Sequence, residues 1–184
     1  MSSYKIIFSG PVGAGKTTAI TSISDEPPVT TDESASDMTK ERKSATTVAL
    51  DYGVMHLDDG ERIHLYGTPG QERFDFMWDI LTTGGIGLVL LLDNTRADPF
   101  QDMRFFLDAF KNFIDETKVV IGVTQMDLNA NPSIGDYHSQ LQGHDLNPPI
   151  FEVDAREKSD VSLLVQFLLY SLDPGLVEES CAAV

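Results

Sequence analysis

The sequence predicts a doubly wound α/β fold, with a six-stranded, mostly parallel sheet, one antiparallel edge strand and helices on both faces. Two observations predict it. Short apolar runs typical of buried strands alternate with segments of helical periodicity, and one hairpin pattern lies among them. With 184 residues the chain is long enough for one full hydrophobic core. We therefore expect a single domain over residues 1–175 and a short tail over 176–184.

The first elements are a strand and a helix joined by glycines. Residues 4–9 form a short apolar run followed by Gly10, and residues 16–24 follow as a helix. Residues 25–45 are polar, contain two prolines and show no sustained apolar period. This composition predicts a long surface loop, of a length that is usually functional or disordered.

A hairpin comes next. Residues 47–57 alternate between apolar and polar side chains, and Asp59-Gly60 supplies a tight turn into residues 62–66. This hairpin adds the antiparallel edge to the sheet.

The remaining elements are buried strands and amphipathic helices. Three apolar runs, at residues 86–92, 118–123 and 150–153, predict parallel strands. Two helical stripes are expected to face the core and to carry no chemistry. They are Phe100, Met103, Phe106, Leu107 and Phe110, and Val161, Leu164, Val165, Leu168 and Leu169.

The composition narrows the class of partner. The chain has 29 acidic and 13 basic residues, a formal net charge of −16, which disfavours general binding to nucleic acid and anionic lipid. Cys181 is the only cysteine, which fits a reducing compartment. No apolar stretch approaches the ~20 residues of a membrane span. We expect a cytoplasmic protein.

Residues 10–17 match the phosphate-binding pattern G-x-x-x-x-G-K-[ST] between the predicted strand and helix. Its glycines let backbone N–H groups converge on phosphate oxygens at a helix N-terminus. Lys16 would reach the β- and γ-phosphates, and the Thr17 hydroxyl would ligate Mg²⁺. The motif alone does not separate a kinase, an ATPase and a GTPase. The candidate contacts are Val12, Gly13, Ala14, Gly15, Lys16, Thr17 and Thr18.

A base site is predicted where Thr124-Gln125-Met126-Asp127 follows the strand at 118–123, outside a carboxyl end. The Asp127 carboxylate can accept hydrogen bonds from guanine N1–H and the 2-amino group, whereas adenine offers no matching pair. The order of the motifs favours guanine over adenine.

Five blocks in order give the chain a resemblance to the Ras-type small GTPases over nearly its whole length. They are GPVGAGKT, a threonine in ATTVALDYG, TPGQERF, TQMD and Asp154-Ala155-Arg156. More narrowly, TTVALDYG followed by LYGTPGQERF resembles the bacterial gliding-motility polarity GTPases (MglA-like) and relatives paired with roadblock-fold regulators. Those proteins also lack the acidic residue before x-P-G-Q, where this chain has Gly67.

The resemblance implies roles for individual residues. Thr47, with Thr46 as the second candidate, would close on Mg²⁺ and the γ-phosphate. Gly70 would offer its N–H to the γ-phosphate, and Gln71 would orient the attacking water. The catalytic group is thus Gln71, Lys16 and Thr47, and the metal ligands are Thr17 and Thr47. Ala155 would donate its N–H to the guanine oxygen, with Thr124, Gln125 and Arg156 beside it, and the cofactors would be GTP or GDP and Mg²⁺.

Departures from the family pattern carry further expectations. Gly67 removes a carboxylate that usually holds Mg²⁺ through water, and Asp51 and Asp93 are the candidates to orient those waters. Val12 can crowd Gln71, which predicts slow intrinsic hydrolysis. Thr46 stands where many polarity-type relatives carry an arginine, so positive charge must come from a partner or from basic residues of the chain, namely Lys40, Arg42, Lys43 and Arg73.

The sequence thus predicts a GTP switch whose loops, about 25–47 and 67–84, bind a roadblock-fold regulator and effectors. Two alternatives stay open, a nucleotide or small-molecule kinase and a GTP-locked scaffold with negligible hydrolysis. The C-terminal CAAV outlines a prenylation box, but Glu178-Glu179-Ser180 before it is not basic, so we expect no stable membrane anchor.

Overall fold

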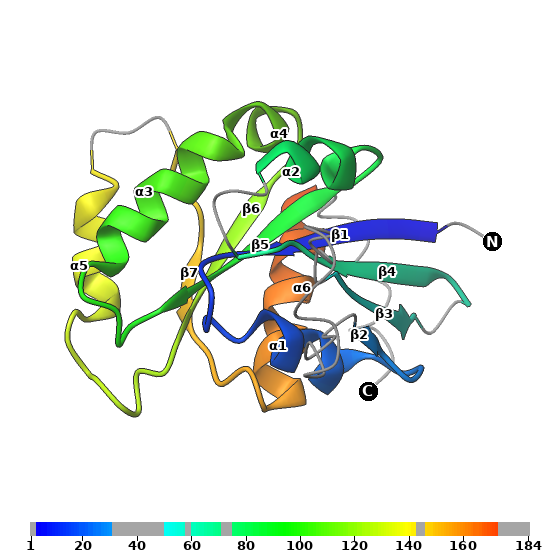
Figure 1. The fold of residues 1–184 in the computed structure, drawn as a ribbon, viewed down its shortest axis with the longest axis horizontal. Helices are drawn as coiled ribbons and strands as arrows, with labels where there is room; N and C mark the ends of the chain where they lie inside the picture. The colour runs from blue at the N-terminus through cyan, green and yellow to red at the C-terminus, as the bar shows by residue number, and fades with distance from the viewer. Residues whose placement is uncertain (1–2, 31–49, 58–59, 71–74, 143–145, 173–184) are drawn as a thin grey trace, which may run out of the picture.

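The computed structural model describes residues 3–30, 50–57, 60–70, 75–142 and 146–172. Within them, seven strands form one sheet in the order β2-β3-β4-β1-β5-β6-β7, with helices on both faces (Figure 1). The α/β class is confirmed. The strands are β1 (Ser3–Ser9), β2 (Val29–Thr30), β3 (Asp51–His56), β4 (Arg62–Gly67), β5 (Gly87–Asp93), β6 (Val119–Thr124) and β7 (Ile150–Glu152). The helices are α1 (Lys16–Ile23), α2 (Asp75–Thr82), α3 (Pro99–Ala109), α4 (Lys111–Glu116), α5 (Ile134–Gln140) and α6 (Lys158–Leu172).

The sheet places the predicted motifs at one edge. Strand β1 pairs in parallel with β4 and β5, and β5, β6 and β7 continue the parallel order. Their carboxyl ends therefore lie on the same side. Residues 10–15 leave β1 there, and the segment after Thr124 leaves β6 there, as expected for a ligand site in an open α/β sheet.

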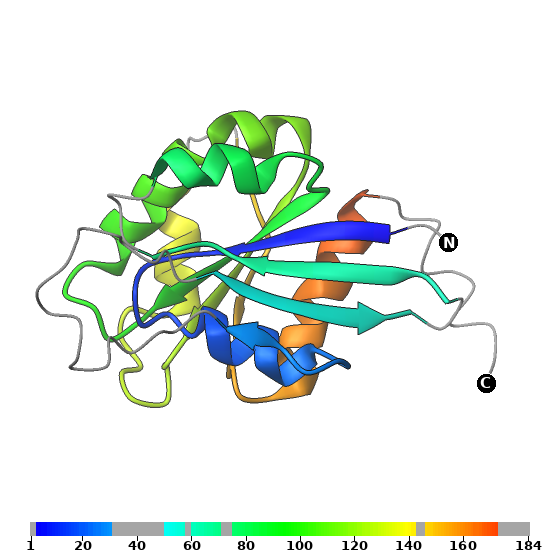
Figure 2. The same ribbon diagram turned by 45° about the vertical axis from the view of Figure 1, so that its right-hand side comes forward.

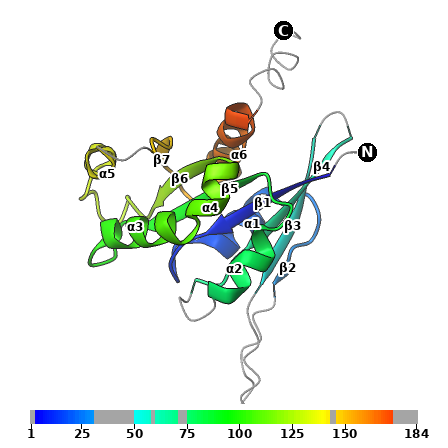
Figure 3. The ribbon, with the colours of Figure 1, turned by 90° about the horizontal axis from the view of Figure 1, so that it is seen from above.

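The expectation of six strands with the hairpin strand at the edge was wrong in one respect. The edge is β2, which lies within the segment 25–45 that was expected to be a loop and pairs antiparallel with β3 through Val29↔Tyr52 and Thr30↔Asp51. Two residues are too few to show a strand period, and their pairing depends on a distant partner, so the local pattern gave no signal. Figure 3 shows β2 and β7 at opposite sides of the sheet.

Two hydrophobic clusters lie on the two faces of the sheet, and successive residues of β1 alternate between them. Ile6 belongs to the cluster that includes residues of α1 and α6, whereas Ile7 belongs to the cluster that includes residues of α2, α3, α4 and α5. Figure 2 shows α1 below the sheet and α2, α3 and α4 above it, and α6 packs in the same cluster as α1. Both predicted helical stripes lie in these clusters, Phe100 and Leu169 being partly buried at the margins.

The hairpin is confirmed by six antiparallel pairs between β3 and β4, from Asp51↔Gly67 to His56↔Arg62. Its turn is closed by a hydrogen bond from the Leu57 N–H to the Glu61 carbonyl, 2.9 Å. Gly60 has φ of 83°, a conformation that glycine adopts without strain. Asp59 lies outside the described residues. Across the described part of the chain, no helix combines the length and apolar character needed to cross a membrane.

Candidate functional site: a phosphate loop joined to a base pocket

The loop between β1 and α1 has the backbone that its glycines allow. Gly10 has φ of 140°, and a Cβ added there would lie 2.0 Å from the Leu91 carbonyl oxygen of β5. Gly15 caps α1 in the left-handed region, with φ of 91°. No side chain fits at Gly10, and only glycine reaches the cap without strain. The loop therefore holds its N–H groups close to the sheet and to the first turn of α1, where anions bind.

Lys16 lies across the loop. Its Nζ donates hydrogen bonds to the carbonyl oxygens of Gly10 and Pro11, both at 2.7 Å, and the residue is only 8% exposed. Burial lowers the pKa of the Lys16 ammonium to about 8, and the negative charge of Asp51 opposes part of that shift. This ammonium is held where a bound phosphate would compete for its hydrogen bonds.

Thr17 reaches across to the hairpin. Its hydroxyl donates to Asp51 Oδ2 at 2.6 Å. Asp51 begins β3 and lies directly opposite Gly67, the last residue of β4. The Thr17 hydroxyl and the Asp51 carboxylate both present hard oxygen atoms, the ligand type that Mg²⁺ prefers. Thr17 and Asp51 therefore fit a magnesium ion beside a phosphate group.

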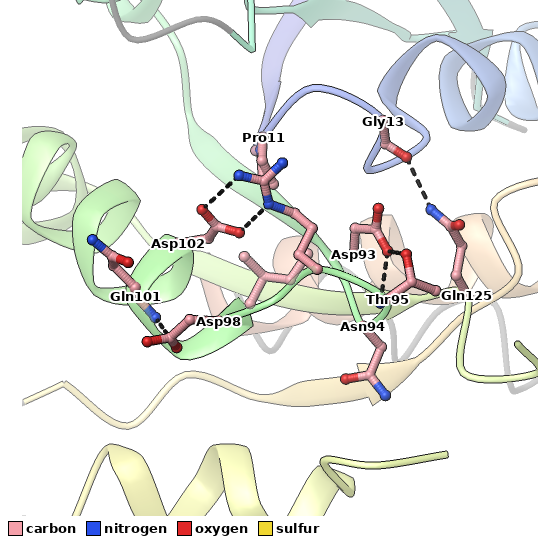
Figure 4. A network of polar contacts seen from close by, with 12 residues as sticks. Pro11, Gly13, Asp93, Asn94, Thr95, Asp98, Gln101, Asp102 and Gln125 are labelled. Carbon is pink, nitrogen blue, oxygen red and sulfur yellow. Dashed lines mark hydrogen bonds and ion pairs between the residues drawn. The ribbon is translucent and has the colours of Figure 1, made fainter. Parts of the chain in front are cut away.

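Asp93, the other candidate to orient magnesium waters, uses one carboxylate oxygen in the turn after β5, while its Oδ2 faces the phosphate loop, 3.8 Å from where a Cβ on Gly13 would lie. Its Oδ1 accepts hydrogen bonds from the Thr95 N–H at 2.8 Å and the Thr95 hydroxyl at 2.6 Å (Figure 4). Asp93 thus stabilises the turn that follows β5, and Asp51 is the carboxylate that contacts the predicted metal ligand.

Gly70 lies against the phosphate loop. A Cβ added to it would be 2.7 Å from both Lys16 Nζ and the Val12 backbone nitrogen. The segment 67–70 is held by Thr68, whose N–H donates to the Phe8 carbonyl at 2.8 Å and whose hydroxyl donates to Ser9 Oγ at 2.8 Å. The backbone that precedes residue 71 therefore begins at the phosphate end of the site. Val12, by contrast, is 57% exposed.

A pocket of about 640 Å³ adjoins this loop. It brings together both ends of the predicted nucleotide site, because its lining comes from the phosphate loop, the segment after β6 and the segment after β7. The predicted residues that line it are Gly13, Ala14, Gly15, Thr18, Thr124, Gln125, Asp127, Ala155 and Arg156.

Thr124 and Gln125 bind the phosphate loop. The Thr124 hydroxyl is buried within hydrogen-bonding distance of the carbonyl oxygens of Ala14, 3.0 Å, and Leu92, 3.1 Å. Gln125, at φ of 60°, donates from Nε2 to the Gly13 carbonyl at 3.0 Å (Figure 4). Both residues join the end of β6 to the loop and so fix the spacing between the two ends of the pocket.

Asp127 and Arg156 are the charged groups at the base end. The Arg156 guanidinium forms a short pair with Asp154, with Nη2 to Oδ2 at 2.6 Å, and lies 3.8 Å from Asp127 Oδ2. Hydrogen bonds from Arg156 lower the pKa of the Asp154 carboxyl to about 2. The side chain of Asp127 is 63% exposed, so its oxygens are open to a ligand in the pocket.

Sequence reasoning missed the groups that hold the loop after β6. Asn94 is fully buried, and its Nδ2 donates to the carbonyl oxygens of Asn129, 2.6 Å, and Pro132, 3.0 Å. The Tyr137 hydroxyl donates to Asn94 Oδ1 at 2.7 Å. No motif signals this network, because its partners are brought together only by the fold.

Several predicted residues lie outside the described part of the chain, namely Thr46, Thr47, Gln71, Lys40, Arg42, Lys43 and Arg73. Their roles stay predictions. Trp78, which lies within the segment 67–84 expected to bind partners, is a core residue, 3% exposed and stacked on Phe110 at a centroid distance of 5.0 Å.

Comparison with known proteins gives a family and several relatives. The model of a family described as a conserved hypothetical ATP binding protein matches residues 26–147, a range that begins after the phosphate loop. The Ras-related protein RabC of Dictyostelium discoideum is 22% identical over 185 residues, covering 97% of this chain and 88% of the relative. The Ras-related protein SEC4 of Candida albicans is 24% identical over 143 residues, 76% of this chain and 68% of the relative. An uncharacterized protein of Methanocaldococcus jannaschii is 30% identical over 98 residues, 53% of this chain and 56% of the relative.

Proposed function

The chain belongs to the family of conserved hypothetical ATP-binding proteins, and we propose that within it this protein is a switch that binds GTP and hydrolyses it slowly to GDP. One observation carries the proposal, namely the single pocket that joins the phosphate loop to Asp127 and Ala155. Similarity to Ras-related proteins over nearly the whole chain supports the same function.

Guanine is the base that suits this pocket best. The exposed Asp127 carboxylate offers two acceptor oxygens, which match the N1–H and 2-amino donors of guanine, and the Ala155 N–H suits its O6. Adenine would leave the carboxylate without a donor pair. The family description names ATP, so the bound base is the first property to measure.

Hydrolysis would use groups of the phosphate loop together with Thr47 and Gln71, which lie outside the described residues. Lys16 would neutralise the β- and γ-phosphates, and Thr17 and Thr47 would hold the magnesium ion that offsets phosphate charge. Gln71 would orient the attacking water beside Gly70. Slow turnover follows from Val12 near that water and from Thr46, which supplies no arginine charge.

The switch would act through partners. The segments 25–47 and 67–84 would change contacts when the γ-phosphate is lost and so select a regulator or effector. By its resemblance to the MglA-like polarity GTPases, the regulator would be a roadblock-fold dimer in a bacterial signalling or motility pathway. We propose a cytoplasmic protein, and its net charge of −16 disfavours a nucleic-acid partner.

The test begins with the nucleotide that the purified protein carries, identified by chromatography, followed by single-turnover phosphate release from added GTP. We expect bound GDP and slow release that falls further in Gln71→Ala. The matched control is Gln101→Ala, in the first turn of α3.

Each other outcome selects a rival. Bound ADP with turnover of ATP would contradict the guanine assignment, and transfer of phosphate to a small molecule would indicate a kinase. Equal, negligible release in wild type and Gln71→Ala would indicate a GTP-locked scaffold.

A further inference from the structure

The space beside Gly67 is filled by the side chain of Asp51. A Cβ added to Gly67 would lie 2.9 Å from Asp51 Cβ, 3.1 Å from Asp51 Oδ2 and 3.1 Å from Ile20 Cδ1. The two residues form a direct pair across the antiparallel ladder, where Cα atoms are ~4.5–5.5 Å apart. The Asp51 carboxylate therefore occupies the place that a side chain at position 67 would need.

The hydrogen bond from Thr17 gives this carboxylate a function. The Thr17 hydroxyl has one hydrogen, and it donates that hydrogen to Asp51 Oδ2 at 2.6 Å. The lone pairs of the hydroxyl oxygen are then left for a cation. A carboxylate that orients a metal ligand in this way also raises the ligand's basicity.

A second carboxylate, Asp93, also lies near the phosphate loop, 3.8 Å from where a Cβ on Gly13 would lie. Asp93 makes a different contact, because its Oδ1 accepts two hydrogen bonds from Thr95, and among the described residues it is the Asp51 carboxylate that accepts the Thr17 hydroxyl. Asp51 is thus the acidic group that contacts the proposed magnesium ligand.

We propose that Asp51 supplies, from the opposite strand, the magnesium-positioning carboxylate that is absent at Gly67, and that Gly67 must lack a side chain to make room for it. The proposal rests on the proposed nucleotide-dependent function. Asp51 is a positioning residue: it holds Thr17 and the water shell of the ion, and it touches no reacting atom.

The test measures how strongly the protein retains a nucleotide as a function of Mg²⁺ concentration. This property is independent of the hydrolysis rate. Release of a fluorescent GDP is followed at increasing Mg²⁺ concentration and in excess EDTA. We expect Asp51→Ala to raise the Mg²⁺ concentration for half-maximal retention by about 10- to 100-fold, the usual effect of losing an outer-shell partner. The release rate in EDTA should stay within about twofold of wild type, because phosphate and base contacts persist.

Exchanging the two facing residues, Asp51 and Gly67, between their strands gives a second test. Gly67→Asp alone should retain nucleotide poorly, because its side chain meets Asp51 and Ile20. In the double variant Asp51→Gly/Gly67→Asp the carboxylate returns to the facing strand, and we expect most of the magnesium effect to be restored. Asp115→Asn, an exposed carboxylate paired with Lys111, is the matched control.

The proposal is overturned if Asp51→Ala keeps the wild-type magnesium midpoint, or if the swap restores folding without restoring that midpoint. Circular dichroism checks folding, and Asp51→Asn, which keeps the shape but removes the charge, replaces Asp51→Ala if the latter unfolds. If the protein retains ADP instead of GDP, the guanine assignment fails. The same titration with fluorescent ADP still tests Asp51, because both nucleotides present the same phosphates to Mg²⁺.

Discussion

At the phosphate end of the pocket Lys16 is 8% exposed and bonded to two carbonyls, whereas at the base end the Arg156 side chain is 69% exposed and Asp127 is nearly as open. The phosphate end is a backbone loop crossed by the buried Lys16 side chain, although Val12 and Gly13 of the loop are exposed. The base end consists of surface charges that contact one another, and exposed ion pairs contribute little to stability. For the proposed nucleotide, this difference predicts that the phosphate end would supply most of the affinity and the base end most of the selectivity.

The largest effect is expected from the buried cation. Lys16→Ala removes a charge-assisted contact to the phosphates, so affinity for GTP and GDP should fall on the order of 100-fold. Isothermal titration measures it, with Lys111→Ala, an exposed lysine paired with Asp115, as the matched control. Equal binding by wild type and Lys16→Ala would contradict the proposal that Lys16 contacts the phosphates of the nucleotide.

A smaller effect is expected at the base end. Asp127→Ala removes the acceptor for the guanine donors, so affinity for GTP should fall about 10- to 100-fold while the weak affinity for ATP stays unchanged. Competition between the two nucleotides measures the ratio. If both affinities fell together, Asp127 would be supporting the pocket and would not be reading the base.

The smallest effect is a pH dependence that belongs to the phosphate end alone. The pKa of Lys16 without ligand is about 8, and bound phosphates would raise it. Below pH 8 most Lys16 is already protonated, so binding takes up little or no proton. Above pH 8 Lys16 must gain a proton when the phosphates bind, so affinity falls as the pH rises. Affinity should be flat up to about pH 7 and about fourfold weaker at pH 8.5.

Fluorescence titrations across this range check the slope. The Asp127→Ala variant should show the same relative fall, because its change lies at the other end of the pocket. A flat wild-type profile would mean that Lys16 stays charged without a ligand, contrary to its burial.

Much of the fold and the phosphate loop could be predicted from the sequence, because their signals are local. The alternation of apolar strands with helical stripes determined the layers, and residues 10–17 carry their own spacing. The two-residue edge strand β2 has no such signal, since a partner 23 positions along the chain, as in Val29↔Tyr52, defines it.

The candidate site was predicted less completely, because contacts across the sheet depend on register. Asp51 and Asp93 were equal candidates in the sequence. The structure distinguishes the two candidates, because the strand pairing places Asp51 opposite Gly67, whereas Asp93 accepts a hydrogen bond from Thr95 in the turn after β5. Asn94 and Tyr137 likewise meet through the fold, 43 residues apart in sequence.

The buried hydroxyl of Thr124 lies within hydrogen-bonding distance of the carbonyls of Ala14 and Leu92, and this contact holds the two ends of the pocket at a set separation. It fixes the distance from the base-binding segment to the phosphate loop before any ligand arrives. In the proposed switch, a molecule would contact both ends at once when its base and phosphates are separated by that distance. A free base or a free polyphosphate would contact one end alone, so we expect the protein to select a nucleotide by its length as well as by its base.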